Sequence, residues 1–318
     1  MQSNRQARRP GRPSSSREQV RQVLAAHRAA GRPFTAGGVR SFVREEGAGP
    51  VVVFTHGMWG ASFAYRKLLT CLADRGIRAV AWDLPGFGFA DRPRDFDYSW
   101  AGLGRFSVDA VDVLGLDRFH LVVHDVGGPI GFELAAARPG QVLSLTVLNT
   151  MVDVSEFRPP WSMRPFRTPV VGELWKAGMN RALFRSLMRL QGVGDTTQVS
   201  NAELDAYLRL MRGDDNGRAF LRVMRSADQS PAKQALYRGV VGDRSRPVQV
   251  IWAADDPALA LASYGEKARR AAQLDALIRI PGKHFPQEDQ AGLIASHIAG
   301  LIATAADGET SGRGLTSG

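Results

Sequence analysis

Between residues 38 and 150, short runs rich in β-branched residues alternate with stretches of helical periodicity. This alternation is typical of βαβ units, in which parallel strands are joined by helices that cover both faces of the sheet. Strand-like runs end near Asn149 and resume at Val248–Trp252 and Ala276–Ile280. The sequence therefore predicts an α/β fold with a mostly parallel central sheet.

The interval between these two groups of strands, residues 151–242, carries Pro-rich connections and helical patterns but no strand pattern. In open α/β folds, ligands bind outside the carboxyl ends of the strands. We therefore predict a helical lid over that edge, inserted between core segments at residues 36–150 and 243–305. Helices are expected in it at Gly172–Gln191, Ala202–Arg212 and Arg218–Met224.

The positive charge is concentrated at the N-terminus. The chain has a net charge of +10, and residues 1–50 supply +7 of it through ten Arg against three Glu. The excess therefore belongs to an arm and not to the folded body, and no nucleic-acid-binding motif accompanies it. We predict a disordered basic arm over residues 1–35 with one short helix from Arg17 to Ala30, and a flexible tail over residues 306–318.

Composition excludes several classes of protein. With 44% apolar and 23% charged residues, the chain has an ordinary globular composition. No apolar run approaches the ~20 residues that span a bilayer. The single cysteine, Cys71, cannot form an internal disulfide and rules out a cysteine-rich metal site. We expect a cytoplasmic protein with no metal, no cofactor and no membrane or nucleic-acid partner, and we make no prediction of its oligomeric state.

The segment with the clearest chemical meaning is the strand Phe119–His124, which runs into Asp125-Val126-Gly127-Gly128 at the start of a helix. A strand, a tight turn and a helix that starts with glycine form a nucleophile elbow, in which the turn exposes one side chain. Here that side chain is a carboxylate, which can attack carbon directly and form an ester that water then hydrolyses. Ordinary serine-hydrolase chemistry is excluded. The alternative is that Asp125 is a helix N-cap.

Two later strands end near residues that suit the same chemistry. Asp255 and Asp256 follow the strand Val248–Trp252, and an acid at that point can orient a histidine and stabilise its protonated form. His284 lies in the loop after the last strand, which completes the chain order nucleophile, acid, base. We predict that Asp125, one of the two acids and His284 form a catalytic set; a turn acid and a surface histidine are the alternatives.

Together these segments resemble the α/β-hydrolase fold over roughly residues 38–305, and within it the haloalkane dehalogenases and their relatives the epoxide hydrolases. Several motifs are more similar to those of the dehalogenases than to those of the epoxide hydrolases. They are the His124-Asp125-x-Gly127-Gly128 elbow, the turn Asp83-Leu84-Pro85-Gly86-Phe87-Gly88 leading to Asp91-Arg92-Pro93, the stretch His284-Phe285-Pro286-Gln287-Glu288-Asp289, and Asn201–Tyr207.

The resemblance implies roles for further residues. The backbone N–H groups of Met58, which follows His56-Gly57, and of Val126 would form an oxyanion hole. The acid of the family directly precedes a proline, which points to Asp256 as the partner of His284, with Asp255 as the alternative.

The chain also departs from both groups. Dehalogenases carry a Trp directly after the nucleophile as one donor to the leaving halide, and this chain has Val126. A second donor is often an Asn after His-Gly, where this chain has Met58, or else a lid Trp. Epoxide hydrolases protonate the opening ring with lid tyrosines, and an expected Tyr-Arg pair appears as Met224-Arg225. The substrate pocket is therefore expected to use Trp59, Trp161, Trp175, Tyr207, Met224 and Tyr237.

These observations predict a hydrolase that forms an alkyl ester on Asp125, most like a haloalkane dehalogenase, with a small apolar substrate and water. One alternative is an epoxide hydrolase. Another is a non-catalytic protein of the same fold that binds a small apolar ligand under its lid. The complete set of Asp125, His284 and Asp256 argues against the last alternative, because a binding pocket needs no such triad.

Overall fold

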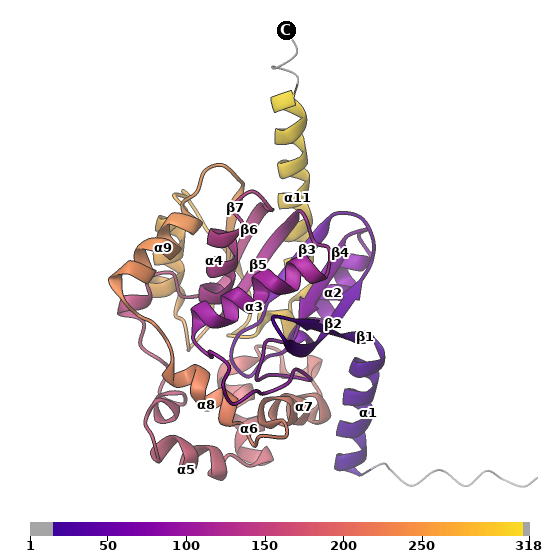
Figure 1. The fold of residues 1–318 in the computed structure, drawn as a ribbon, viewed down its shortest axis with the longest axis vertical. Coiled ribbons are helices and arrows are strands. Elements are labelled where there is room, and N and C mark those ends of the chain that lie inside the picture. The colour runs from indigo at the N-terminus through magenta and orange to yellow at the C-terminus, as the bar shows by residue number, and fades with distance from the viewer. Residues whose placement is uncertain (1–14, 314–318) are drawn as a thin grey trace, which may run out of the picture.

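The computed structural model describes residues 15–313. Within them, an eight-stranded sheet has the order β1-β2-β4-β3-β5-β6-β7-β8. The pairs β1/β2 and β2/β4 are antiparallel and the remaining pairs are parallel. Helices cover both faces of this sheet (Figure 1). The prediction of a mostly parallel sheet between two layers of helices is therefore confirmed.

The elements follow the predicted alternation up to residue 150. The strands are β1 (Gly31–Ala36), β2 (Val39–Glu46), β3 (Val51–Thr55), β4 (Arg78–Trp82), β5 (Phe119–Asp125), β6 (Val142–Thr150), β7 (Val248–Ala253) and β8 (Ile278–Ile280). The helices outside residues 151–242 are α1 (Ser16–Ala29), α2 (Arg66–Ala73), α3 (Trp100–Val113), α4 (Gly127–Ala137), α10 (Glu266–Ala271) and α11 (Ala291–Arg313).

Alternation along the strands divides the core into two layers. On one face, Leu68 and Leu72 of α2 pack with Ile294 of α11 against strand residues such as Val52. On the other face, α3 and α4 pack against residues such as Val123 in a larger apolar cluster. The sheet is thus covered on both sides, and its carboxyl edge is the part left for a site.

The N-terminal segment differs from its prediction. The expected helix is present as α1, but residues 31–35, assigned to a disordered arm, form β1 together with Ala36. Ala36 pairs with Val39, so Gly37-Gly38 is a two-residue hairpin turn with both φ values positive, a turn that glycine favours. Residues 1–14 of the predicted arm lie outside the described residues. At the other end α11 continues to Arg313, beyond the start of the predicted tail.

Residues 151–242, called the helical insertion below, contain α5 (Val171–Gly178), α6 (Arg181–Leu187), α7 (Asn201–Arg212), α8 (Arg218–Arg225) and α9 (Pro231–Val241). Helices α5 to α8 gather at one end of the sheet (Figure 1). The predicted helix 172–191 is split, because Asn180 caps a new helix through a hydrogen bond from the Leu183 N–H. Helix α9 was not predicted, and it packs on α4 through Tyr237 and Phe132.

Candidate active site

The predicted nucleophile, Asp125, is the last residue of β5 and has a backbone φ of +52°. A positive φ strains a non-glycine residue by about 1–3 kcal/mol and persists where surrounding contacts hold it. Here the Thr150 hydroxyl donates a 2.5 Å hydrogen bond to the Asp125 carbonyl oxygen. The strand, the strained turn and helix α4 thus have the form of a nucleophile elbow.

Two glycines let this elbow lie against its neighbours. A Cβ atom at Gly127 would lie 2.1 Å from the carbonyl oxygen of Thr55, and one at Gly128 would lie 1.8 Å from Thr150 Oγ1. No side chain fits at those distances, so α4 can begin directly against β3 and β6 because both positions are glycine. The position of the Asp125 carboxylate follows from this close packing.

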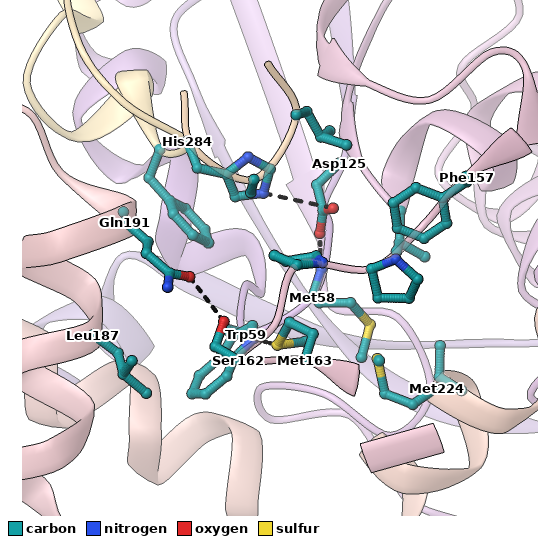
Figure 2. A pocket seen from close by; sticks show the side chains of 18 of the residues that line it. Met58, Trp59, Asp125, Phe157, Ser162, Met163, Leu187, Gln191, Met224 and His284 are labelled. Carbon is teal, nitrogen blue, oxygen red and sulfur yellow. Dashed lines mark hydrogen bonds and ion pairs between the residues drawn. The ribbon is translucent and has the colours of Figure 1, made fainter. Parts of the chain in front are cut away.

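Asp125, His284 and Asp256 meet at the carboxyl edge of the sheet. Oδ2 of Asp125 accepts a 2.6 Å hydrogen bond from the backbone N–H of Met58, and Oδ1 lies 3.6 Å from His284 Nε2 (Figure 2). Nδ1 of His284 lies 2.9 Å from Asp256 Oδ2. The structure therefore joins three side chains from distant parts of the sequence in one line of polar contacts.

Of the two adjacent acids, Asp256 is the one that reaches His284, and Asp255 is exposed. Oδ1 of Asp256 accepts hydrogen bonds from the backbone N–H groups of Ala258 at 2.7 Å and Leu259 at 3.0 Å. An ionised carboxylate accepts bonds on both oxygens, so Oδ2 remains for the histidine. The loop after β7 thereby sets the direction in which Asp256 points.

Asn149 is a supporting residue that the sequence analysis missed. Its side-chain N–H donates to Asp256 Oδ2 at 2.7 Å, and its Oδ1 accepts the Ala253 N–H at 2.9 Å. Asn149 also has a positive φ of 36°. Its place at the end of β6, on the same edge as the other site residues, is the sequence signal that could have identified it.

The loop that carries His284 is held from two sides. Its backbone N–H groups at His284 and Phe285 donate to the carbonyl oxygens of Gln191 and Gly192, at 3.3 and 2.7 Å. Nε2 of His124 lies 2.7 Å from the His284 carbonyl oxygen. Burial lowers the pKa of His124 to about 4, so its ring is neutral and Nε2 can donate this bond. The helical insertion and β5 therefore fix the histidine loop together.

The charges of the site stabilise one another. Burial raises the pKa of Asp125, but contact with His284 and the Met58 N–H outweighs burial and leaves this pKa below its usual value. For Asp256 as well, burial raises the pKa, but contact with His284 outweighs burial and leaves this pKa below its usual value. Burial lowers the pKa of His284, but Asp256 and Asp125 outweigh it and raise this pKa to about 10. At neutral pH the site holds two carboxylates and one imidazolium.

A cavity of about 90 Å³ borders Asp125 and His284. Its walls are mainly apolar with a few polar groups, which is typical of a site for a small molecule. The walls that belong to the core include Met58, Trp59, Trp100, Val126, Leu259 and Phe285. Those that belong to the helical insertion include Phe157, Met163, Leu187, Met188, Val223 and Met224 (Figure 2).

Two of the six residues predicted for the substrate pocket, Trp59 and Met224, border the cavity. The prediction is wrong for Trp161, whose side chain is 56% exposed. It is also wrong for Trp175, which packs beside the cavity wall and donates its indole N–H to the Ser162 carbonyl oxygen at 3.1 Å.

Both tyrosines predicted for the pocket lie elsewhere. The Tyr207 hydroxyl donates to the buried carboxylate of Glu288. The Tyr237 hydroxyl donates to Glu133 on α4 at 2.8 Å. In each case a carboxylate away from the cavity, buried for Glu288 and half-buried for Glu133, takes the hydroxyl, because a buried O–H without an acceptor would be costly.

The described residues show neither a metal centre nor a membrane segment. Within residues 15–313, no group of three or more His, Cys, Asp and Glu side chains is placed to hold a metal ion. In the same range, no helix has the length and apolar character needed to cross a bilayer.

Comparison with known proteins places this geometry in a family. The model of the alpha/beta hydrolase fold family matches residues 50–291. A haloalkane dehalogenase of Mycolicibacterium paratuberculosis is 32% identical over 257 residues, which cover 79% of this chain and 82% of that protein.

Solved structures agree. Haloalkane dehalogenase DbeA from Bradyrhizobium elkani matches with a TM-score of 0.70 at 24% identity, over 86% of this chain and 99% of that chain. Epoxide hydrolase VrEH1 from Vigna radiata matches with a TM-score of 0.69 at 23% identity, over 86% and 97%. The chain therefore belongs to the α/β-hydrolase fold family and is a hydrolase related to the haloalkane dehalogenases.

Proposed function

We propose that this chain hydrolyses a carbon–halogen bond of a small apolar molecule through a covalent ester on Asp125. The observation that carries the proposal is the Asp125 carboxylate at the cavity wall, with one oxygen bound to the Met58 N–H and the other facing His284. The relative that is 32% identical is named a haloalkane dehalogenase. The mainly apolar cavity suits such a substrate.

In the first step, Oδ1 of Asp125 attacks the carbon that bears the halogen. This oxygen is the freer of the two, because Oδ2 is held at 2.6 Å by the Met58 N–H and Oδ1 has the longer 3.6 Å contact with His284. The lowered pKa keeps the carboxylate ionised at neutral pH, so no base is needed. A carbon–oxygen bond forms, the carbon–halogen bond breaks, and the halide leaves with the electron pair.

In the second step, water hydrolyses the ester. Esterification removes the charge of Asp125, one of the two anions that raise the pKa of His284, so the pKa of the histidine falls and its Nε2 releases a proton to solvent. The neutral Nε2 then accepts a proton from the attacking water. Asp256 stabilises the imidazolium that forms. The oxyanion develops on Oδ2, where the Met58 N–H already lies, and the Val126 N–H is the proposed second donor. The ester oxygen then leaves as an alcohol, protonated by His284.

Epoxide hydrolysis is less well supported. An epoxide oxygen needs a proton donor as the ring opens, and Tyr207 and Tyr237, the two tyrosines predicted for the pocket, are bound to Glu288 and Glu133. None of the described residues that border the cavity is a tyrosine. A pure binding function is disfavoured because a strained turn and three linked charges would give a binding pocket no advantage.

Halide release and epoxide opening, measured side by side with bromobutane and epoxybutane, test the proposal. Wild-type protein is expected to release bromide and to open the epoxide more slowly. Asp125→Ala should lose bromide release by about 10⁴-fold or more, because no other group can form the ester. Bromide release that survives in Asp125→Ala contradicts the proposal, and faster opening of the epoxide would reassign the substrate.

A further inference from the structure

The proposed first step creates an anion inside mainly apolar walls. A halide in such surroundings is costly unless a hydrogen-bond donor meets it. The residue directly after the nucleophile is Val126, whose side chain has no donor. An N–H group that borders the cavity and is not already bonded is therefore required.

The Nε2 of His284 faces Asp125, and three other side chains at the cavity wall have N–H groups but suit this role poorly. The Trp59 indole N–H donates to Met163 Sδ at 2.9 Å (Figure 2). The Gln191 side chain is only half-buried, so water competes for its N–H groups. Its amide oxygen, which accepts a 2.8 Å hydrogen bond from the Ser162 hydroxyl, would also repel an anion bound beside it. Arg167 is exposed to solvent at this wall, where water competes for its guanidinium.

Trp100 differs from these residues. It is the first residue of α3, its side chain is 2% exposed, and it borders the cavity. Its indole N–H donates no hydrogen bond to any residue within 15–313. Trp82 also has an unpaired indole N–H, but that atom is sealed in the core, whereas the Trp100 nitrogen is not. Because Trp100 is otherwise buried and borders the cavity, we infer that this nitrogen faces the cavity.

Helix packing places Trp100 beside the nucleophile elbow. Helices α3 and α4 each follow a parallel strand and run away from the same sheet edge. A Cβ atom at Gly104 of α3 would lie 2.4 Å from Glu133 Cβ and 3.4 Å from the Ile130 carbonyl oxygen of α4. Trp100 lies one turn earlier in α3, so it is level with the start of α4 and with Val126.

We propose that the indole N–H of Trp100 binds the departing halide, supplying the donor that Val126 lacks. This inference rests on the proposed function. As the bond from Asp125 to carbon forms, the carbon–halogen bond breaks, the halide takes its electron pair, and the Trp100 N–H donates a hydrogen bond to the halide. No proton is transferred in this step, because an indole N–H is only a donor.

Two measurements on Trp100→Phe test the inference, with Trp82→Phe as the matched control. Bromide binding is measured by calorimetry, which does not depend on the fluorescence of the replaced side chain. The rate of ester formation from bromobutane is measured by intact mass in a His284→Gln background. Trp100→Phe should weaken bromide binding and slow ester formation by roughly tenfold or more each, because the lost bond is to a charged group. Trp82→Phe should change neither by more than about twofold.

The outcomes separate this inference from the proposed function. If Trp100→Phe forms the ester and binds bromide as well as Trp82→Phe does, the Trp100 inference is overturned and the proposed function stands. If no variant with an intact Asp125 forms an ester, the proposed function fails and the inference fails with it. Should Trp100→Phe not fold, bromide soaked into wild-type crystals must give an anomalous peak within hydrogen-bond distance of Trp100 Nε1; a peak elsewhere in the cavity overturns the inference.

Discussion

The two sides of the cavity are built differently. On the side of the sheet edge, Asp125, His284, Asp256 and Asn149 are linked by hydrogen bonds and ion pairs, and two of them have positive φ values. On the side of the helical insertion, the wall consists mainly of apolar side chains such as those of Phe157, Met163, Leu187 and Met224. The core therefore supplies the linked charged groups of the site, and the helical insertion supplies the apolar wall that shapes the cavity.

This difference indicates that the two sides of the cavity have different functions. Charged groups must be held in fixed positions to act on a reacting atom, and strands with tight turns provide that rigidity. An apolar wall of short helices can vary in shape without disturbing the charges. The two sides are coupled through the backbone bonds from His284 and Phe285 to Gln191 and Gly192, so the insertion also helps to hold the histidine loop.

The largest expected effect separates the two adjacent acids of the core side. Asp256→Asn removes the charge that stabilises protonated His284, so turnover should fall by roughly 10²–10⁴-fold while ester accumulates. Asp255→Asn is the matched control and should retain near wild-type turnover, because Asp255 is exposed. Steady-state kinetics with intact-mass detection gives both values. Equal losses in the two variants would contradict the assignment of Asp256.

The next effect concerns stability against pH. The pKa of His284 is raised from 6.5 to about 10 by its two carboxylates, so its proton stabilises the folded state. This contribution is fully present below about pH 6.5 and is lost as the pH rises to about 10. Urea unfolding at several pH values should show that the free energy of unfolding falls across this window. His284→Gln should lack that part of the slope, and an unchanged slope would contradict the ion pairs.

Sequence-based prediction was more successful for the sheet edge than for the helical insertion. The sheet and the meeting of Asp125, His284 and Asp256 were predicted, because parallel strands bring their carboxyl ends to one edge. Asp256 was preferred to Asp255 because the acid of the resembled family directly precedes a proline, here Pro257. In the helical insertion, periodicity indicates helices but not which neighbours a side chain meets. Tyr207 was therefore assigned to the pocket although its hydroxyl binds a buried carboxylate.

Two local features also escaped prediction. Trp100 gave no signal, because its place beside the elbow depends on how closely α3 packs on α4. Strand β1 was missed although Gly37-Gly38 marks a hairpin turn, because the basic residues around it suggested a disordered arm. The first error arises from a contact between segments that is visible only in the folded chain, and the second from a local turn signal that the charge of the region outweighed.

A pair of glycine variants compares the rigidity of the two sides. Gly128→Ala places a methyl group 1.8 Å from Thr150 Oγ1, so we expect a loss of about 1–3 kcal/mol in the free energy of unfolding together with lower activity. Gly178→Ala, in the helical insertion, meets no atom within 4 Å and should leave stability unchanged or slightly higher. Chemical denaturation measures both. A tolerated Gly128→Ala would mean that the elbow is not held by close packing.

The smallest effect belongs to the apolar wall. Leu187→Ala enlarges the cavity, so KM for short bromoalkanes should rise by about tenfold or less, and longer bromoalkanes should be affected less. The rate of ester hydrolysis should not change, because Leu187 touches none of the three linked charges. Kinetics over a series of chain lengths gives this result. A large fall in the hydrolysis rate would show that the two sides do not act separately.

The covalent ester on Asp125 is tested most directly with His284→Gln, which retains the carboxylate and lacks the base. After incubation with bromobutane, intact-mass spectrometry should show one butyl adduct, and peptide mapping should place it on Asp125. A single turnover of wild-type protein in ¹⁸O-water should label the same carboxylate, because water attacks the ester carbonyl carbon. If wild-type protein turns over bromobutane while His284→Gln forms no adduct and no label enters Asp125, the proposed nucleophile is wrong.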